Sequence, residues 1–272
     1  MGLRDRGVEI KTPGQLDAMR RAGLVVGETL ERVRAAIAPG VSTAELDAIA
    51  EDSIRGAGAT PSFLGYHGFP ASICASVNDE VVHGIPGDRV IGAGDVVSID
   101  CGAIVDGWHG DAAFTVAVGE VPAELARLLE VTEESLWRGI AAARLGGRVT
   151  DISHAVETHV RSQGDYGIVE DYTGHGIGTA MHQPPNVPNY GRPGRGPKLV
   201  TGLALAVEPM VTLGTHLTSV LDDDWTVVTD DGSWAAHFEH SFALTPDGAW
   251  VLTALDGGEA RLGELGVPFG GR

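Results

Sequence analysis

Residues 98–113 read SIDCGAIVDGWHGDAA and place Asp100 and Asp111 in an otherwise apolar, glycine-rich stretch. The Asp-Gly pair in its middle predicts a two-residue hairpin turn between two strands. Such a hairpin pairs Asp100 with Ala113 and Gly102 with Asp111, so the two carboxylates lie diagonally on one face of the ribbon. Like charges at this spacing repel, and burying them unpaired costs several kcal/mol each, so the stretch predicts a cation between them.

The composition narrows the class of protein. The chain has 272 residues, 43% of them hydrophobic, which is enough for a sizeable core. A net charge of −18 argues against nucleic acid as the main partner. The two cysteines provide no disulfide framework, which fits a reducing compartment. Because we find no signal peptide and no apolar run of membrane-spanning length, we expect a cytoplasmic protein without a membrane contact. We also expect a monomer.

Two capping boxes mark the starts of the first two expected helices. Thr12 and Gln15 open a helix whose apolar residues recur at alternating spacings of three and four until a Pro-Gly pair ends it. Ser42 and Glu45 open a second helix, which runs to about Gly56. Strands are then expected at SFLGYHGFP (62–70), ICASVNDEVVHGI (73–85), DVVSIDCGAIV (95–105) and GWHGDAAFTVAVG (107–119).

The order of two helices followed by strands then repeats. Residues 122–145 and 150–163 have the pattern of two more helices, and strands resume from about 167 to 253. A loop rich in proline and glycine is expected at 184–197.

A short sequence echo accompanies this repetition. VHGIP at 82–86 recurs as GHGIG at 174–178, and each is followed by an apolar strand that ends in an acid, Asp100 or Glu208. A hairpin strand with another acid follows in both places, and these acids are Asp111 and Glu239. Three features in the same order indicate a duplicated half-domain.

We therefore predict one α/β domain over residues 1–272. Its related halves would span about 12–120 and 121–253 and would face each other across one central site.

The acids of the two halves suggest the chemistry of that site. A single acid on a strand is most often a surface residue, but Asp100 and Glu208 end apolar runs, where exposure is not expected. Four clustered carboxylates carry a charge of about −4, which two divalent cations would neutralise, and the imidazole of His175 would complete the ligand set. Oxygen donors favour Mn²⁺, Fe²⁺ or Co²⁺ over a thiolate-type structural zinc.

Six motifs occur in order along the chain: GYHGFPASICASVNDEVVHGIP, SIDCGAIVDGWHGDAA, GHGIG, AVEPM, DDDWTVVTDDGS and HFEHSFALT. Together they resemble type I methionine aminopeptidases, over about residues 12–253. The resemblance implies a "pita-bread" α/β fold with internal pseudo-twofold symmetry around a dimetal centre. It also implies removal of the N-terminal methionine from nascent polypeptides when the second residue is small. These substrates would include polypeptides at the ribosome.

The resemblance further implies roles for individual residues. The ligands of two divalent ions (Co²⁺, Mn²⁺, Fe²⁺ or Zn²⁺) would be Asp100, Asp111, His175, Glu208 and Glu239. A metal-bridged hydroxide would attack the first peptide bond, with Glu208 as general base, His182 polarising the carbonyl and His83 bonded to the scissile amide. The methionine pocket would be lined by Tyr66, Phe69, Cys74, Met181 and Trp225.

Some features depart from the family pattern or allow alternatives. Met181 stands where the family often has Phe, and Gln183 where it usually has Glu, which bears on substrate preference. Cys101 alternates to the face opposite Asp100 and is expected as a packed thiol, whereas Cys74 fits the core and the pocket equally well.

Two other functions compete with this interpretation. The first is a proline-specific aminopeptidase or dipeptidase of the same fold, which usually carries a large additional N-terminal domain. The second is a non-catalytic protein that binds peptides or the ribosome, a class that tends to lose the metal ligands.

The start of the chain is itself a possible substrate. Met1 precedes the small residue Gly2, so we expect Met1 to be removed. Because the first helix begins near Thr12, the roughly ten residues before it are expected to be flexible enough to enter another molecule's active site.

Overall fold

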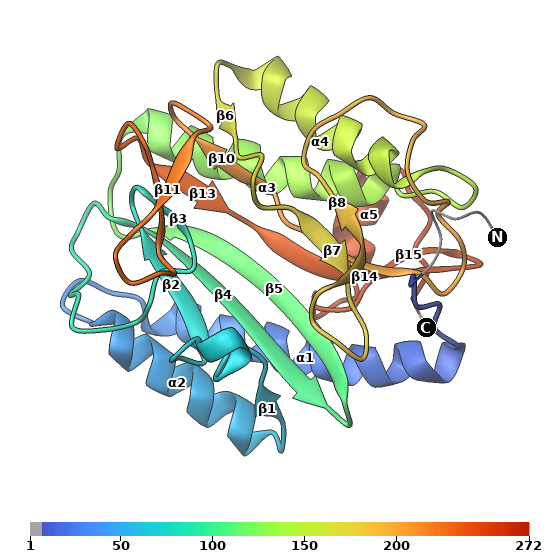
Figure 1. The fold of residues 1–272 in the computed structure, drawn as a ribbon, viewed down its shortest axis with the longest axis horizontal. Helices are drawn as coiled ribbons and strands as arrows, with labels where there is room; N and C mark the ends of the chain where they lie inside the picture. Colours follow the sequence, from blue (N-terminus) through green and yellow to red (C-terminus); the bar gives the residue numbers. More distant parts are fainter. Residues whose placement is uncertain (1–6, 272) are drawn as a thin grey trace.

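The computed structural model describes residues 7–271 and places its strands between two pairs of long helices (Figure 1). The helices are α1 (Pro13–Ala36), α2 (Thr43–Gly56), α3 (Ala123–Ala142), α4 (Val149–Gln163) and α5 (Glu259–Glu264). The strands of the first half are β1 (Thr60–Pro61), β2 (Ile73–Val77), β3 (Glu80–Val82), β4 (Val96–Val105) and β5 (Trp108–Ala117). Those that follow are β6 (Gly167–Ile168), β7 (Gly174–Gly176), β8 (Gln183–Val187), β9 (Ala204–Val207), β10 (Met210–Thr212), β11 (Thr218–Val220), β12 (Val227–Thr229), β13 (Ala235–His237), β14 (Glu239–Thr245) and β15 (Gly248–Val251).

The main sheet joins strands from both ends of the chain. Within the described residues it has nine strands, in the order β1–β4–β5–β14–β9–β7–β8, with β2 paired to β4 and β15 paired to β14. Two three-stranded sheets, β13–β10–β6 and β11–β12–β3, contain the other strands of residues 7–271. The pairing of β5 with β14 brings the central hairpin against a strand from the end of the chain.

The helices bury their apolar faces against these strands. Both predicted capping boxes are present, Thr12 with Gln15 and Ser42 with Glu45. Helix α1 lies along β4 and β5, whereas α3 and α4 cover the strands of the second half (Figure 1). No helix within residues 7–271 is long and apolar enough to cross a membrane.

The predicted mixed α/β architecture and the central hairpin are confirmed. Asp100 pairs with Ala113 and Gly102 with Asp111, as the Asp-Gly turn requires. Cys101 is fully buried in the large apolar core, also as predicted.

Two predictions of local structure were wrong. Segment 62–70 contains no strand, because Gly65 and Gly68 have positive φ and residues 66–68 form a 3₁₀ turn, η2 (Tyr66–Gly68). The predicted loop at 184–197 begins inside strand β8, which contains two prolines. Strand β8 lies at an edge of the sheet, where a missing N–H group is tolerated.

The segment before α1 also differs from expectation. Met1 and Gly2 lie outside the described residues, but residues 8–11 are docked rather than free. Ile10 forms a β-bridge with Leu203, and the Lys11 N–H donates to the Gly202 carbonyl at 2.8 Å. A Cβ atom at Gly202 would lie 2.3 Å from the Lys11 carbonyl oxygen, so the glycine permits this close approach.

Helix α1 crosses β5 at Gly110 in direct backbone contact. A Cβ atom at Gly110 would lie 2.8 Å from the Gly23 nitrogen and 2.9 Å from the Ala22 carbonyl carbon. We expect Gly110→Ala to lower the free energy of unfolding by about 1–3 kcal/mol, because the helix must move off the sheet. Urea denaturation measures the change, and Gly263→Ala in α5, where a Cβ meets nothing within 4 Å, is the control. Equal losses in both variants would contradict the close contact.

Candidate metal centre

Strand register places the acids of the two halves on one face of the main sheet. Ala113 of β5 pairs on one side with Asp100 of β4 and on the other with Glu239 of β14. Residues that pair across strands share a face of the sheet, and so do residues two apart on one strand. Asp111, two residues before Ala113, therefore lies on the same face as Asp100 and Glu239.

The same reasoning extends across the next two strands. Ser241, two residues after Glu239, pairs with Ala206 of β9, which in turn pairs with His175 of β7. Glu208 lies two residues beyond Ala206 and therefore shares the face. The positions between the acids are small and buried (Ala113, Ala206 and Ser241), which leaves space above the sheet where the larger side chains meet.

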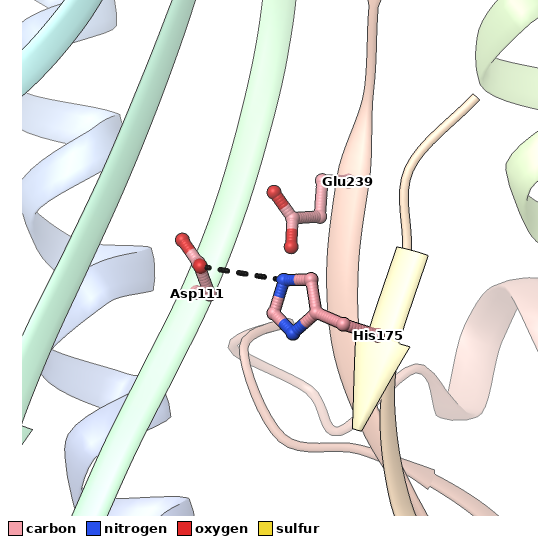
Figure 2. Close-up of side chains that lie close together, drawn as sticks. All are labelled: Asp111, His175 and Glu239. Carbon is pink, nitrogen blue, oxygen red and sulfur yellow. Dashed lines mark ion pairs between the residues drawn. The ribbon is translucent and has the colours of Figure 1, made fainter. Parts of the chain in front are cut away.

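The side chains converge closely. Figure 2 shows Asp111, His175 and Glu239 pointing toward one another from three strands, and their potential ligand atoms lie within 4.8 Å of one another. His175 Nε2 is 3.9 Å from Asp111 Oδ2 and 3.4 Å from Glu208 Oε1. His175 Nδ1 lies 3.0 Å from the Gly176 carbonyl oxygen and donates to it, so the Nε2 lone pair faces the carboxylates.

The electrostatics of this cluster call for a cation. Burial raises the pKa of Asp100 to about 7. The pKa values of Asp111, Glu208 and Glu239 are raised as well. Burial is the largest cause of each shift, and the charges of neighbouring carboxylates are the second. Burial lowers the pKa of His175 to about 3, so its imidazole is neutral at pH 7.

Unsatisfied oxygens give an independent test of whether metal ions fit. Three buried carboxylate oxygens have no hydrogen-bond partner, and they are Asp100 Oδ1, Asp111 Oδ1 and Glu239 Oε1. Native proteins rarely leave such groups unpaired, and divalent metal ions would satisfy them. An oxygen-rich donor set with one neutral imidazole suits Mn²⁺, Fe²⁺, Co²⁺ or Zn²⁺.

His237 was not among the residues predicted from the sequence, yet it belongs to the same cluster. It is 1% exposed, and neither ring nitrogen has a hydrogen-bond partner. Its Nε2 lies 4.0 Å from Glu208 Oε2, and Glu208, His237 and Glu239 form a second group of potential ligands. The His-Phe-Glu order could have identified it, because residues two apart in an extended chain share a face.

A pocket opens beside the acids. The structure brings every predicted site residue to its wall, together with Phe63, which was not predicted. The space inside the pocket and at its open mouth is about 560 Å³. Cys74 pairs with Asp100, belongs to a small apolar cluster and lines the pocket, whereas Cys101 lies in the large core.

Two further histidines line this pocket. The Tyr66 hydroxyl lies 2.8 Å from His182 Nδ1, and the rings of His182 and His175 are 4.4 Å apart. Burial lowers the pKa of His83 to about 4 and also lowers the pKa of His182. His83 has a φ of 61°, a strained conformation of the kind that clusters at functional sites.

Comparison with known proteins identifies the family of this chain. Residues 17–246 match metallopeptidase family M24. Methionine aminopeptidase 1 of Mycobacterium tuberculosis is 58% identical over 254 residues, which cover 91% of this chain and 96% of that protein. The solved structure of methionine aminopeptidase from Thermotoga maritima has a TM-score of 0.89 and 42% identity, covering 91% of this chain and 99% of that one. Prolidase from Pyrococcus furiosus shares the fold, with a TM-score of 0.74 and 22% identity, and this chain covers 66% of it.

The raised carboxyl pKa values predict how metal ions and protons compete at the site. A raised pKa means that the folded state binds protons more tightly than the unfolded state. Proton binding by these carboxyl groups therefore stabilises the fold at low pH, and this stabilisation is lost as pH rises. For Asp100 the loss spans its ordinary pKa of 3.8 to about 7. We expect the rise in melting temperature on adding Mn²⁺ to increase across this window, because deprotonated carboxylates bind the ion. A metal-induced rise that is constant with pH would contradict the cluster's role.

Proposed function

The chain belongs to metallopeptidase family M24 and removes N-terminal methionine from polypeptides, and we propose that it does so with two divalent metal ions. The observation that carries the proposal is the convergence of three carboxylates near the neutral imidazole of His175, with the carboxylate of Asp100 on the wall of the same pocket. We propose that the ions, Co²⁺, Mn²⁺, Fe²⁺ or Zn²⁺, are held by Asp100, Asp111, His175, Glu208 and Glu239.

Divalent ions at such a centre supply Lewis acidity, which lowers the pKa of water and polarises a carbonyl oxygen. We assign the proton from the attacking water to Glu208, whose carboxylate lies in the cluster, with Oε1 3.4 Å from His175 Nε2, and lines the pocket. Its two oxygens lie near two imidazoles, Oε1 at 3.4 Å from His175 Nε2 and Oε2 at 4.0 Å from His237 Nε2.

The two pocket histidines are assigned to the scissile peptide. If the Tyr66 hydroxyl donates to His182 Nδ1, the neutral ring carries its hydrogen on Nε2 and can donate to the carbonyl oxygen as negative charge develops there. His83 is assigned to a hydrogen bond with the scissile amide. Its imidazole is neutral at pH 7 and is held edge-on against Tyr172 and Trp225.

The pocket suits a methionine side chain. Its wall combines aromatic rings with two sulfur atoms, and such surfaces favour a flexible thioether. Phe69 and Trp225 pack edge-to-face at 5.0 Å, and Cys74 and Met181 complete the same apolar cluster. An N-terminal amine entering beside the acids would restrict the enzyme to the first peptide bond.

The competing functions receive less support. The proline-specific neighbour shares the fold at much lower identity than the methionine aminopeptidases. A non-catalytic binding protein would not need five candidate metal ligands at the base of the pocket.

We further propose that the enzyme acts in the cytoplasm as a monomer on nascent polypeptides, including those at the ribosome. Cys74 and Cys101 are free thiols, which a reducing compartment would preserve.

Metal dependence provides the first test. We expect a chelator to abolish hydrolysis of the peptide Met-Gly-Met and Mn²⁺, Fe²⁺ or Co²⁺ to restore it, while an X-Pro peptide is not cleaved. Asp111→Asn should lower kcat by more than about 10²-fold and reduce bound metal, because one of the proposed ligands is weakened. The control is Asp106→Asn at the exposed tip of the same hairpin. Full activity of Asp111→Asn would overturn the two-metal proposal.

The pocket histidines provide the second test. Because neither His83 nor His182 is assigned as a ligand, alanine at either position should leave metal content nearly unchanged. We expect kcat to fall by about 10²–10³-fold, the usual cost of one lost acid–base or oxyanion partner. Elemental analysis and peptide kinetics measure the two effects, with the exposed His216→Ala as control. Loss of metal from either pocket variant would show that the ligand set is misassigned.

A further inference from the structure

The segment before α1 lies against the loop that carries two pocket residues. This His182 loop, residues 178–183, holds Met181 and His182 between Thr179 and Gln183. Gln183 Nε2 donates to Glu9 Oε2 at 2.7 Å, and the Thr179 N–H donates to the same oxygen at 3.2 Å. The Thr179 hydroxyl also donates to the Glu9 carboxylate at 3.2 Å. One carboxylate therefore holds the loop on both sides of His182.

Lys11 fixes the position of Glu9. Its side chain is 1% exposed, and its Nζ lies 3.7 Å from Glu9 Oε2 and donates to the Glu9 carbonyl at 3.1 Å. A buried ammonium needs a nearby counter-charge, so the two side chains constrain each other. Both pack directly on the loop, since a Cβ atom at Gly178 would lie 2.3 Å from Glu9 Oε2 and 2.6 Å from Lys11 Cε.

The other side of the loop contacts the pocket. The His109 N–H donates to the Gly178 carbonyl at 2.9 Å, and Tyr66 contacts His182 as described above. The loop is thus held between strand β5 and the segment before α1. Moving that segment would change where the His182 ring and the Met181 side chain sit in the pocket.

We propose that Glu9 is a positioning residue, which acts through Thr179 and Gln183 to orient His182 and Met181. The proposal rests on the function assigned above to His182. Catalytic groups displaced by about 1 Å can lose up to about 10²-fold in rate, so a carboxylate distant from the chemistry can control it.

An exchange of the two hydrogen-bonding groups tests this interaction. Glu9→Ala should lower kcat for Met-Gly-Met roughly tenfold while bound metal stays unchanged. Gln183→Glu should also lower kcat, because two carboxylates then face each other. The double variant Glu9→Gln with Gln183→Glu restores one donor and one acceptor with their positions exchanged. Its kcat should therefore regain most of what Gln183→Glu alone loses. Because glutamine keeps the shape of residue 9, the exchange remains informative if Glu9→Ala unfolds.

The control is Glu45→Ala, which removes a carboxylate that anchors Ser42 in the α2 capping box at 2.8 and 2.7 Å. It should lower thermal stability and leave kcat/KM unchanged. Wild-type kcat in Glu9→Ala, or a double variant no better than Gln183→Glu, would overturn the proposal. If the wild-type protein fails to cleave Met-Gly-Met, the proposed function falls and this inference with it, whereas an active wild type with unaffected Glu9 variants overturns this inference alone.

Discussion

The removal of four clustered carboxylates from water is the constraint on which the centre of this molecule depends. Asp100 and Asp111 come from one hairpin, Glu208 follows β9 and Glu239 begins β14, and burial is the first cause of the raised pKa of each. Such a cluster destabilises the metal-free fold, so the rest of the structure must hold it in place. The pairing of β5 with β14 and of β14 with β9 does so, because it leaves small residues between the acids. Ser241 also links β14 to β5 directly, since its hydroxyl donates a hydrogen bond to the Asp111 backbone carbonyl at 2.8 Å.

Strand alternation then separates the two faces of the sheet. Asp100 and its partner Cys74 face the pocket, whereas the next residue, Cys101, lies in the core beneath the helices. A shift of register by one residue would move the acids into that apolar core. The close contact of α1 with Gly110 therefore matters for the site as well as for stability, because Gly110 immediately precedes Asp111.

Much of the sheet and its acids could be predicted because local rules determine them. The Asp-Gly turn fixed the register of β4 and β5, and the two capping boxes located the starts of α1 and α2. Strand β8 and the docking of residues 8–11 were missed because they depend on partners far away in the sequence. Turn η2 was missed although its cause is local, the positive φ of Gly65 and Gly68. His237 also has a local signal, since it lies two residues before Glu239 and therefore shares its face.

These failures concern the parts of the pocket that lie outside the sheet. Tyr66 comes from η2, Met181 and His182 from the loop before β8, and Trp225 from the turn between β11 and β12. The sheet can therefore keep its acids in register while these segments vary in sequence. Gln183 illustrates how such variation is accommodated. Its amide can donate to a carboxylate where a glutamate could not, and Glu9 supplies that carboxylate. This edge of the pocket is thus held by a segment that contributes no candidate metal ligand, so the contact that supports His182 is separate from the metal cluster.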